Sequence, residues 1–128
     1  MIYSKKVLRH FLHPKHMGRI KNPDGVGQAG NIICGDTMEL YLKIKRDKKK
    51  KKEVIKDLKF QTIGCAAAIS SSDVACELLK GKTLEQALKL KPEDIIKKLG
   101  GLPEVKVHCS LLGVEALKSA IKNYLERK

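Results

Sequence analysis

The stretch Leu58-Lys59-Phe60-Gln61-Thr62-Ile63-Gly64-Cys65-Ala66-Ala67-Ala68 contains the point at which the chain changes from strand to helix patterning. Two segments before Gly64 alternate apolar and polar residues, as half-buried strands do: Met38–Ile44 and Leu58–Thr62. After Gly64 the pattern is helical to the end of the chain. Strands followed by helices predict an α+β fold. In this fold, helices pack against one face of a small antiparallel β-sheet of about three strands.

Local signals predict the elements around these two strands. Ser4 can cap an N-terminal helix that His13-Pro14 should end. Residues 21–30 are rich in glycine and polar residues, which predicts a loop. The run Lys48–Lys52 lies between the two strands, and it favours a solvated hairpin loop over a binding patch.

The C-terminal half carries signals for helix starts and helix ends. Thr83 and Gln86 match a capping box, and Pro92 suits the first turn of a further helix. Residues 102–107 predict an extended link to the last helix. The helices expected in this half cover residues 66–80, 83–90, 92–100 and 110–127.

Length and composition limit the classes of function. The 128 residues are about the length of one domain, so we expect residues 1–128 to form a single domain. The net charge of +13 favours anionic partners, but an aromatic content of 4% offers little base stacking and argues against nucleic acid. The apolar runs are far shorter than the roughly 20 residues of a membrane helix, so no membrane partner is expected. Four cysteines in a lysine-rich chain predict free thiols in a reducing, cytoplasmic compartment.

Three cysteines lie at the ends of predicted elements, where a fold can bring distant residues together: Cys34, Cys65 and Cys109. Asp36 follows the first by two residues and would share its direction in an extended chain, and His108 directly precedes the third. Thiolates with a carboxylate and an imidazole suit zinc or an iron–sulfur cluster. Spacing alone leaves open whether these residues form one site or are three unrelated core thiols.

Other residues of metal-binding type favour structural roles. Cys76 lies on the same predicted helix as Cys65, roughly 16 Å further along its axis, so we expect a buried core thiol. Pro14 should break the helix between the N-terminal histidines, which favours surface or loop-packing roles for them. These histidines are His10, His13 and His16.

Taken together, these sequence contexts resemble the U-type iron–sulfur cluster assembly scaffolds, IscU and the N-terminal domain of NifU. A Cys-Gly-Asp, a Gly-Cys before a small-residue helix and a late His-Cys are highly specific in this order and spacing. SufU proteins carry a long insertion between the second and third cysteines, and its absence favours the IscU side. The resemblance runs nearly end to end, through Tyr3–Val7, Asn22-Pro23, Cys34-Gly35-Asp36, Gly64–Ser72, Leu79–Thr83 and His108-Cys109.

The resemblance implies a scaffold, not an enzyme, in which Cys34, Cys65 and Cys109 bind a transient [2Fe–2S] cluster. Asp36 and His108 are the competing candidates for the fourth ligand. The implied partners are a cysteine desulfurase as sulfur donor, acceptor apoproteins as recipients, and a second protomer if a homodimer shares the cluster. Zinc would fit the same ligands, so a zinc-binding sulfur acceptor is the alternative function.

This chain departs from the family pattern at two positions. Ala66 follows the second cysteine where the family usually has glycine, a change that should be tolerated. Glu104 replaces the second proline of the family's chaperone-recognition segment, which predicts weak or absent binding of an Hsp70-type chaperone. The corresponding partner-binding residues here are Leu102, Pro103, Val105 and Lys106.

A cysteine-nucleophile enzyme is the alternative from another functional class. His108 and Cys109 are adjacent in sequence, and adjacent side chains on a helix do not face each other. No motif that would form an oxyanion hole is evident. The sequence therefore favours a scaffold over an enzyme.

Overall fold

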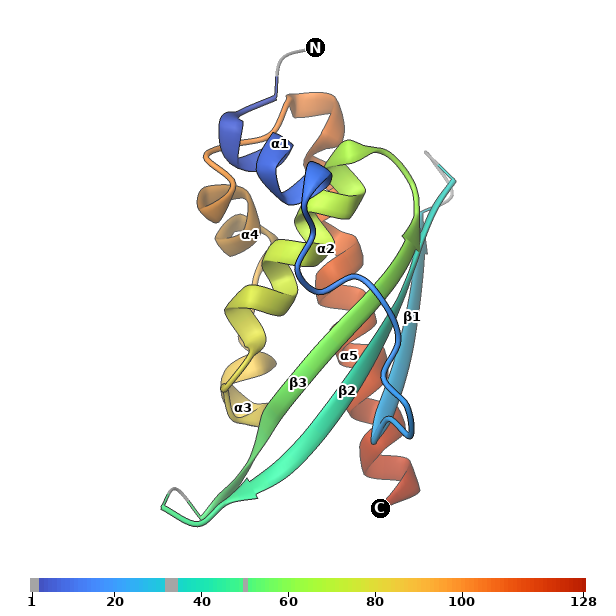
Figure 1. The fold of residues 1–128 in the computed structure, drawn as a ribbon, viewed down its shortest axis with the longest axis vertical. Coiled ribbons are helices and arrows are strands. Elements are labelled where there is room, and N and C mark those ends of the chain that lie inside the picture. The colour runs from blue at the N-terminus through green and yellow to red at the C-terminus, as the bar shows by residue number, and fades with distance from the viewer. Residues whose placement is uncertain (1–2, 32–34, 50) are drawn as a thin grey trace.

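The computed structural model describes residues 3–31, 35–49 and 51–128. Figure 1 shows one sheet, with α2 and α5 against one face and with α1 and α4 packed against the helices. The predicted α+β class is therefore confirmed. The elements are, in chain order, α1 (Lys5–Leu12), β1 (Gly25–Asn31), β2 (Asp36–Asp47), β3 (Lys52–Ile63), α2 (Ala66–Leu79), α3 (Leu84–Ala87), α4 (Pro92–Lys98), the 3₁₀ helix η1 (Glu104–Cys109) and α5 (Ser110–Arg127).

The sheet has the order β1-β2-β3, and both strand pairs are antiparallel. Leu40 pairs with Phe60 and Leu42 with Leu58, so the alternating apolar residues of both strands face one side. All four side chains are at most 1% exposed and pack in the main core with α2 and α5. The alternation in the sequence correctly predicted the buried face of β2 and β3.

The prediction of a loop over residues 21–30 is wrong for its second half, where β1 pairs with β2. Glycines occur there because α5 lies directly against this strand. A Cβ atom on Gly25 would lie 2.6 Å from the carbonyl oxygen of Ala120, and one on Gly27 would overlap the backbone of α5. Glycine in β1 therefore permits close packing between strand and helix and does not mark a turn.

Helix α5 has the predicted bounds and also covers the free edge of β1. The amide of Val26 donates to Asn123 Oδ1 over 3.0 Å, and the amide of Gln28 donates to Ser119 Oγ over 3.2 Å. Side chains of α5 thus satisfy backbone groups that an uncovered edge strand would expose.

Helix α2 is buried on nearly all sides, because the sheet, α1, α4 and α5 all contact it. Ser4 caps α1 as predicted by accepting a hydrogen bond from the Val7 amide over 3.1 Å. Its hydroxyl also donates to the Leu99 carbonyl over 2.5 Å, which ties α1 to the end of α4. Among the described residues, no helix combines the length and the apolar character needed to cross a bilayer.

Two predictions about the C-terminal half of the chain need correction. The helix expected to reach about Leu90 ends at Ala87, because the chain then tightens into three-residue turns. The extended link expected over residues 102–107 contains η1 instead, which opens with a 2.8 Å hydrogen bond from the Lys106 amide to the Pro103 carbonyl. A 3₁₀ helix leading into an α-helix is a frequent arrangement at helix N-termini.

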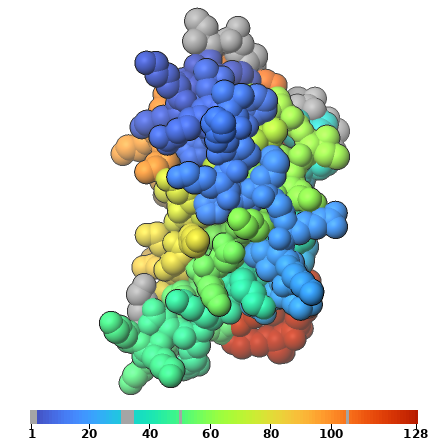
Figure 2. Space-filling model, viewed as in Figure 1, coloured from blue at the N-terminus to red at the C-terminus, as the bar shows by residue number. Residues whose placement is uncertain are grey.

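Figure 2 shows two segments of the chain at the surface of the molecule. The residues between α1 and β1 cover part of the outer face of the sheet, on the side away from α2 and α5. The hairpin between β2 and β3 projects beyond the helices, and Lys48 and Lys49 are exposed there. A solvated hairpin loop was predicted for this lysine run.

Candidate metal centre

Three chain segments meet at one end of the sheet. Asp36 is the first residue of β2, Cys65 is the N-cap of α2, and Cys109 ends η1 and precedes α5. The antiparallel pair Thr37 and Ile63 brings the start of β2 beside the end of β3, where the chain turns into α2. The fold therefore collects ligand-type side chains that lie 29 to 73 residues apart in sequence.

The ligand atoms of Asp36, Cys65 and Cys109 all lie within 4.8 Å of one another. The two sulfurs are 3.9 Å apart, and Asp36 Oδ2 lies 3.8 Å from Cys65 Sγ and 3.6 Å from Cys109 Sγ. Tetrahedral zinc, with bonds of about 2.3 Å to sulfur and about 2.1 Å to oxygen, separates two sulfurs by about 3.8 Å and sulfur from oxygen by about 3.6 Å. The spacing of the three donors therefore fits one tetrahedral metal ion.

Gly64 leaves the space that the Asp36 carboxylate occupies. A Cβ atom at Gly64 would lie 2.8 Å from Asp36 Cγ and 2.9 Å from Ala68 Cβ. Gly35, which precedes Asp36, has a φ of +70°, a conformation that glycine adopts without steric cost. The glycines of the Cys-Gly-Asp and Gly-Cys motifs thus have a steric role in the geometry of the site.

The two remaining predicted ligands, Cys34 and His108, are not among the three converging residues that the structure describes. Cys34 lies outside the described residues, so it contributes nothing to the distances above. His108 lies in η1 next to Cys109, and its Nε2 atom is buried without a hydrogen-bond partner. Within residues 3–31, 35–49 and 51–128, the converging ligand group contains Asp36 and not His108.

Two further side chains influence the electrostatics of the site. The negative charge of the Cys65 thiolate, with a hydrogen bond to it, raises the pKa of Lys106 and favours its ammonium form. Burial raises the pKa of Tyr3, and the thiolate of Cys65 adds a smaller contribution in the same direction. The sequence placed Lys106 in a predicted partner segment and Tyr3 in a stretch that resembles the family. Their proximity to the cysteines had no signal in the local sequence.

The predicted partner segment has a half-buried start and an exposed centre. Leu102 and Pro103 are half-buried, and Leu102 packs against the apolar cluster that α1, α2 and α4 share. Glu104 is exposed, and the side chain of Val105 lies outside the described part of the structure. Lys106 is half-buried, on the side of the segment that reaches Cys65.

The remaining candidate ligands have structural contacts. Cys76 is fully buried in the main core, as predicted, and burial raises the pKa of its thiol well above the ordinary value. His10 Nδ1 lies 2.6 Å from Asp73 Oδ2, and the His16 amide donates to Asp73 Oδ1 over 2.9 Å. Asp73 thus ties both α1 and the segment after it to α2.

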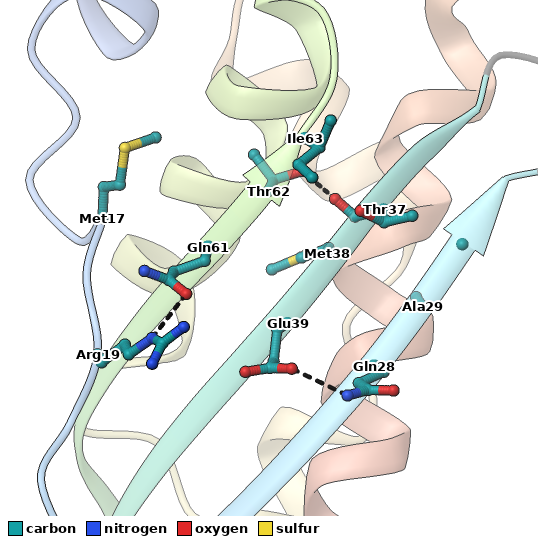
Figure 3. A pocket seen from close by; sticks show the side chains of 11 residues that line it. Met17, Arg19, Gln28, Ala29, Thr37, Met38, Glu39, Gln61, Thr62 and Ile63 are labelled. Atoms are coloured by element: carbon teal, nitrogen blue, oxygen red, sulfur yellow. Dashed lines mark hydrogen bonds between the residues drawn. The ribbon is translucent and has the colours of Figure 1, made fainter.

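The outer face of the sheet has a hollow of about 780 Å³ (Figure 3), and its lining includes Thr37 and Ile63, which are adjacent in sequence to Asp36 and Gly64. Arg19 Nε donates to Gln61 Oε1 over 2.8 Å, and Gln28 Nε2 donates to Glu39 Oε2 over 2.9 Å. Ile63 lines the end of the hollow nearest Gly64 and is 77% exposed. Polar side chains fill the centre of the hollow, and a second exposed apolar residue, Met17, also lines it.

Comparison with known proteins identifies relatives along nearly the whole chain. The model of the NifU-like N terminal domain family matches residues 2–128. The chain is 48% identical to the iron-sulfur cluster assembly scaffold protein IscU 1 of Archaeoglobus fulgidus, over 98% of this chain and 78% of the relative. It is 44% identical to the protein named IscU of Aquifex aeolicus over the same shares. A SufU protein structure from Fervidobacterium islandicum superposes with a TM-score of 0.73 at 28% identity, covering 93% of this chain and 96% of that one.

Proposed function

Because the chain belongs to the NifU-like N-terminal domain family, we propose that it is a scaffold on which an iron–sulfur cluster is assembled and then transferred to acceptor apoproteins. The observation that carries the proposal is the convergence of Asp36, Cys65 and Cys109 within 4.8 Å. The relatives in Archaeoglobus fulgidus and Aquifex aeolicus are named as scaffold proteins for this assembly, which supports the same role here. The cluster is then cargo, and a scaffold rather than an enzyme is the proposed class.

The proposed ligands of a [2Fe–2S] cluster are Cys34, Cys65 and Cys109, with Asp36 as the fourth. Soft thiolates suit iron and sulfide, whereas a carboxylate oxygen is a harder and weaker ligand. One weak ligand among strong ones suits a scaffold, because such a ligand exchanges more readily than a thiolate when the cluster leaves. His108 is the competing fourth ligand, and its buried Nε2 without a partner supports it.

The chain's own residues would prepare the site before iron arrives. Cys65 caps α2 and Cys109 precedes α5, so both sulfurs lie at the N-terminus of a helix, where the backbone N–H groups favour negative charge. Lys106 holds an ammonium group beside Cys65, which offsets part of the repulsion between thiolates. These contacts favour the close approach of the two sulfurs that a shared metal requires.

A zinc-binding sulfur acceptor is the second candidate function. The separations of 3.6 to 3.9 Å match a tetrahedral zinc shell, and this observation specifically favours a single ion. Both functions use the same cysteines. The spectrum of the loaded protein separates them, because zinc has no visible absorption and a [2Fe–2S] cluster has sulfide-to-iron charge-transfer bands.

The partners proposed for the scaffold follow from its cargo. A cysteine desulfurase supplies sulfur, and acceptor apoproteins receive the cluster, which is bound by one protomer or shared in a homodimer. Glu104 is exposed in the segment expected to contact an Hsp70-type chaperone, so we propose weak binding there. We further propose that residues 1–128 act as one scaffold domain in the cytoplasm, because its free thiols need a reducing compartment.

Anaerobic reconstitution with iron and sulfide tests the proposal. We expect visible charge-transfer bands in the wild-type protein and their loss in Cys34→Ser, Cys65→Ser and Cys109→Ser, because each variant removes a thiolate ligand. The matched control is Cys76→Ser, in which the buried thiol lies in the core and the bands should remain. A colourless protein carrying stoichiometric zinc would favour the second function, and equal loss in the Cys76 variant would contradict the ligand assignment.

A further inference from the structure

A groove of about 600 Å³ lies at the other end of α2, where α2, α3, α4 and α1 approach one another. Five lysines from four parts of the chain line it: Lys6, Lys82, Lys89, Lys97 and Lys98. All five are exposed, and none forms an ion pair within the described residues. Lysines elsewhere do form pairs, as Lys43 does with Asp24 and Lys80 with Asp57.

The groove contains little negative charge to balance these lysines. Asp94 is the one carboxylate among its described lining residues. Its Oδ2 atom accepts a 3.0 Å hydrogen bond from the Lys91 amide and so caps α4. The groove therefore keeps a positive potential that attracts an anionic partner.

The floor of the groove is apolar. Leu78 and Leu90 are half-buried, and Leu79, which is the last residue of α2 and belongs to the main core, is 2% exposed. Leu78 and Leu90 also pack against the apolar cluster shared by α1, α2 and α4, so their positions are fixed by the fold. The groove thus presents a firm apolar floor between lysine side chains.

From this combination we propose that the groove binds an acidic amphipathic helix of a partner protein. Acidic residues of such a helix would pair with the lysines while its apolar stripe covers the leucines. An added strand is disfavoured, because the Lys82 backbone is already used: its amide donates to Leu79 and its carbonyl accepts from Ile55. Nucleic acid is disfavoured as well, because no aromatic side chain lines the described groove for base stacking.

The groove is separate from the metal centre. Cys65 is the N-cap of α2 and Leu79 is its last residue, and the 14 helical residues between these ends span about 21 Å. A helix bound in the groove would leave the ligand group uncovered, so this partner could remain bound during cluster assembly and transfer. The inference goes beyond the proposed function, since the groove needs no cluster to bind its partner.

Fluorescence anisotropy with the metal-free protein tests the inference. The probe is a fluorescein-labelled helical peptide of about 16 residues, with leucine at every third or fourth position and glutamate elsewhere. We expect Lys82→Glu/Lys97→Glu to raise its dissociation constant at least about tenfold, because each change replaces an attraction by a repulsion. The neutral variant Lys82→Gln/Lys97→Gln should give an intermediate loss.

The matched control variant is Lys48→Glu/Lys49→Glu in the exposed hairpin, which changes the net charge by the same amount. Binding to this variant should stay within about twofold at roughly 0.15 M salt, where distant charges are screened. Equal losses in both glutamate variants would overturn the proposal in favour of diffuse attraction. So would equally tight binding of a peptide with serine in place of leucine, or tighter groove-dependent binding of single-stranded DNA. Circular dichroism checks that each variant is folded.

Discussion

The two ends of α2 are built in different ways. At its N-terminal end, Asp36, Cys65 and Cys109 converge through short motifs in which glycine sets the backbone and makes space. At its C-terminal end, the groove takes one lysine from α1, two from α4 and one from the turn on each side of α3. The first site depends on placement to within fractions of an ångström, whereas the second depends on summed charge over a firm apolar floor. A single substitution should therefore damage the first and only weaken the second.

The largest expected difference follows from Gly64→Ala. The new Cβ atom would lie 2.8 Å from Asp36 Cγ, so the carboxylate has to leave its position beside the two sulfurs. We expect zinc affinity to fall about 100-fold, as when the support of a metal ligand is removed. Competition with a coloured chelator measures this affinity. Peptide binding in the groove should not change.

Gly30→Ala is the matched control, since its Cβ atom would meet nothing closer than the Asp36 carbonyl oxygen at 3.9 Å. Its zinc affinity should equal that of the wild type. If Gly64→Ala also retained full affinity, Asp36 would not belong to the zinc-binding set. The contrast between the two ends of α2 would then lose its structural basis.

The same difference explains what the sequence could predict. Ser110–Arg127 and the Thr83 capping box were predicted correctly because their signals are local. β1 was missed because its glycines resemble a loop, and their packing against α5 is visible only in the fold. The convergence at Cys65 could be anticipated only from the resemblance to a known family. The groove could not be anticipated at all, because its lysines come together only after four elements have packed.

Zinc binding should increase the difference in local stability between the two ends of α2. Thiolates held together without a cation repel each other, so metal should stabilise the segments that carry them. At a free zinc concentration about 100 times the dissociation constant, the free energy of unfolding rises by about 2.7 kcal/mol. Hydrogen exchange should show this protection in residues 104–110 and little or none in residues 82–98. Equal protection of both segments would mean that zinc stabilises the whole molecule and not the metal end.

The smallest expected effect concerns Cys76, which lies on α2 between the two sites and is fully buried. Burial raises the pKa of its thiol in the folded protein, so the unfolded chain loses this proton at lower pH than the folded one. The stabilisation is therefore complete below about pH 8.5, the ordinary thiol pKa, and is lost as pH rises toward the folded value. Between pH 7 and pH 9.5 the free energy of unfolding should fall by about 1.4 kcal/mol through this group alone.

Cys76→Ala removes this contribution and should flatten the alkaline loss of stability. Urea unfolding of the metal-free wild type and variant at pH 7 and pH 9.5 measures the difference, and the other titrating groups, Tyr3 and Tyr41 included, are common to both proteins. Peptide binding in the groove and zinc binding at pH 7 should be the same in both, because the Cys76 side chain reaches neither site. An identical loss of stability in the two proteins would contradict this prediction. It would show that the Cys76 thiol stays protonated in the unfolded chain or ionises in the folded core. The buried middle of α2 would then contribute nothing to the pH dependence of stability.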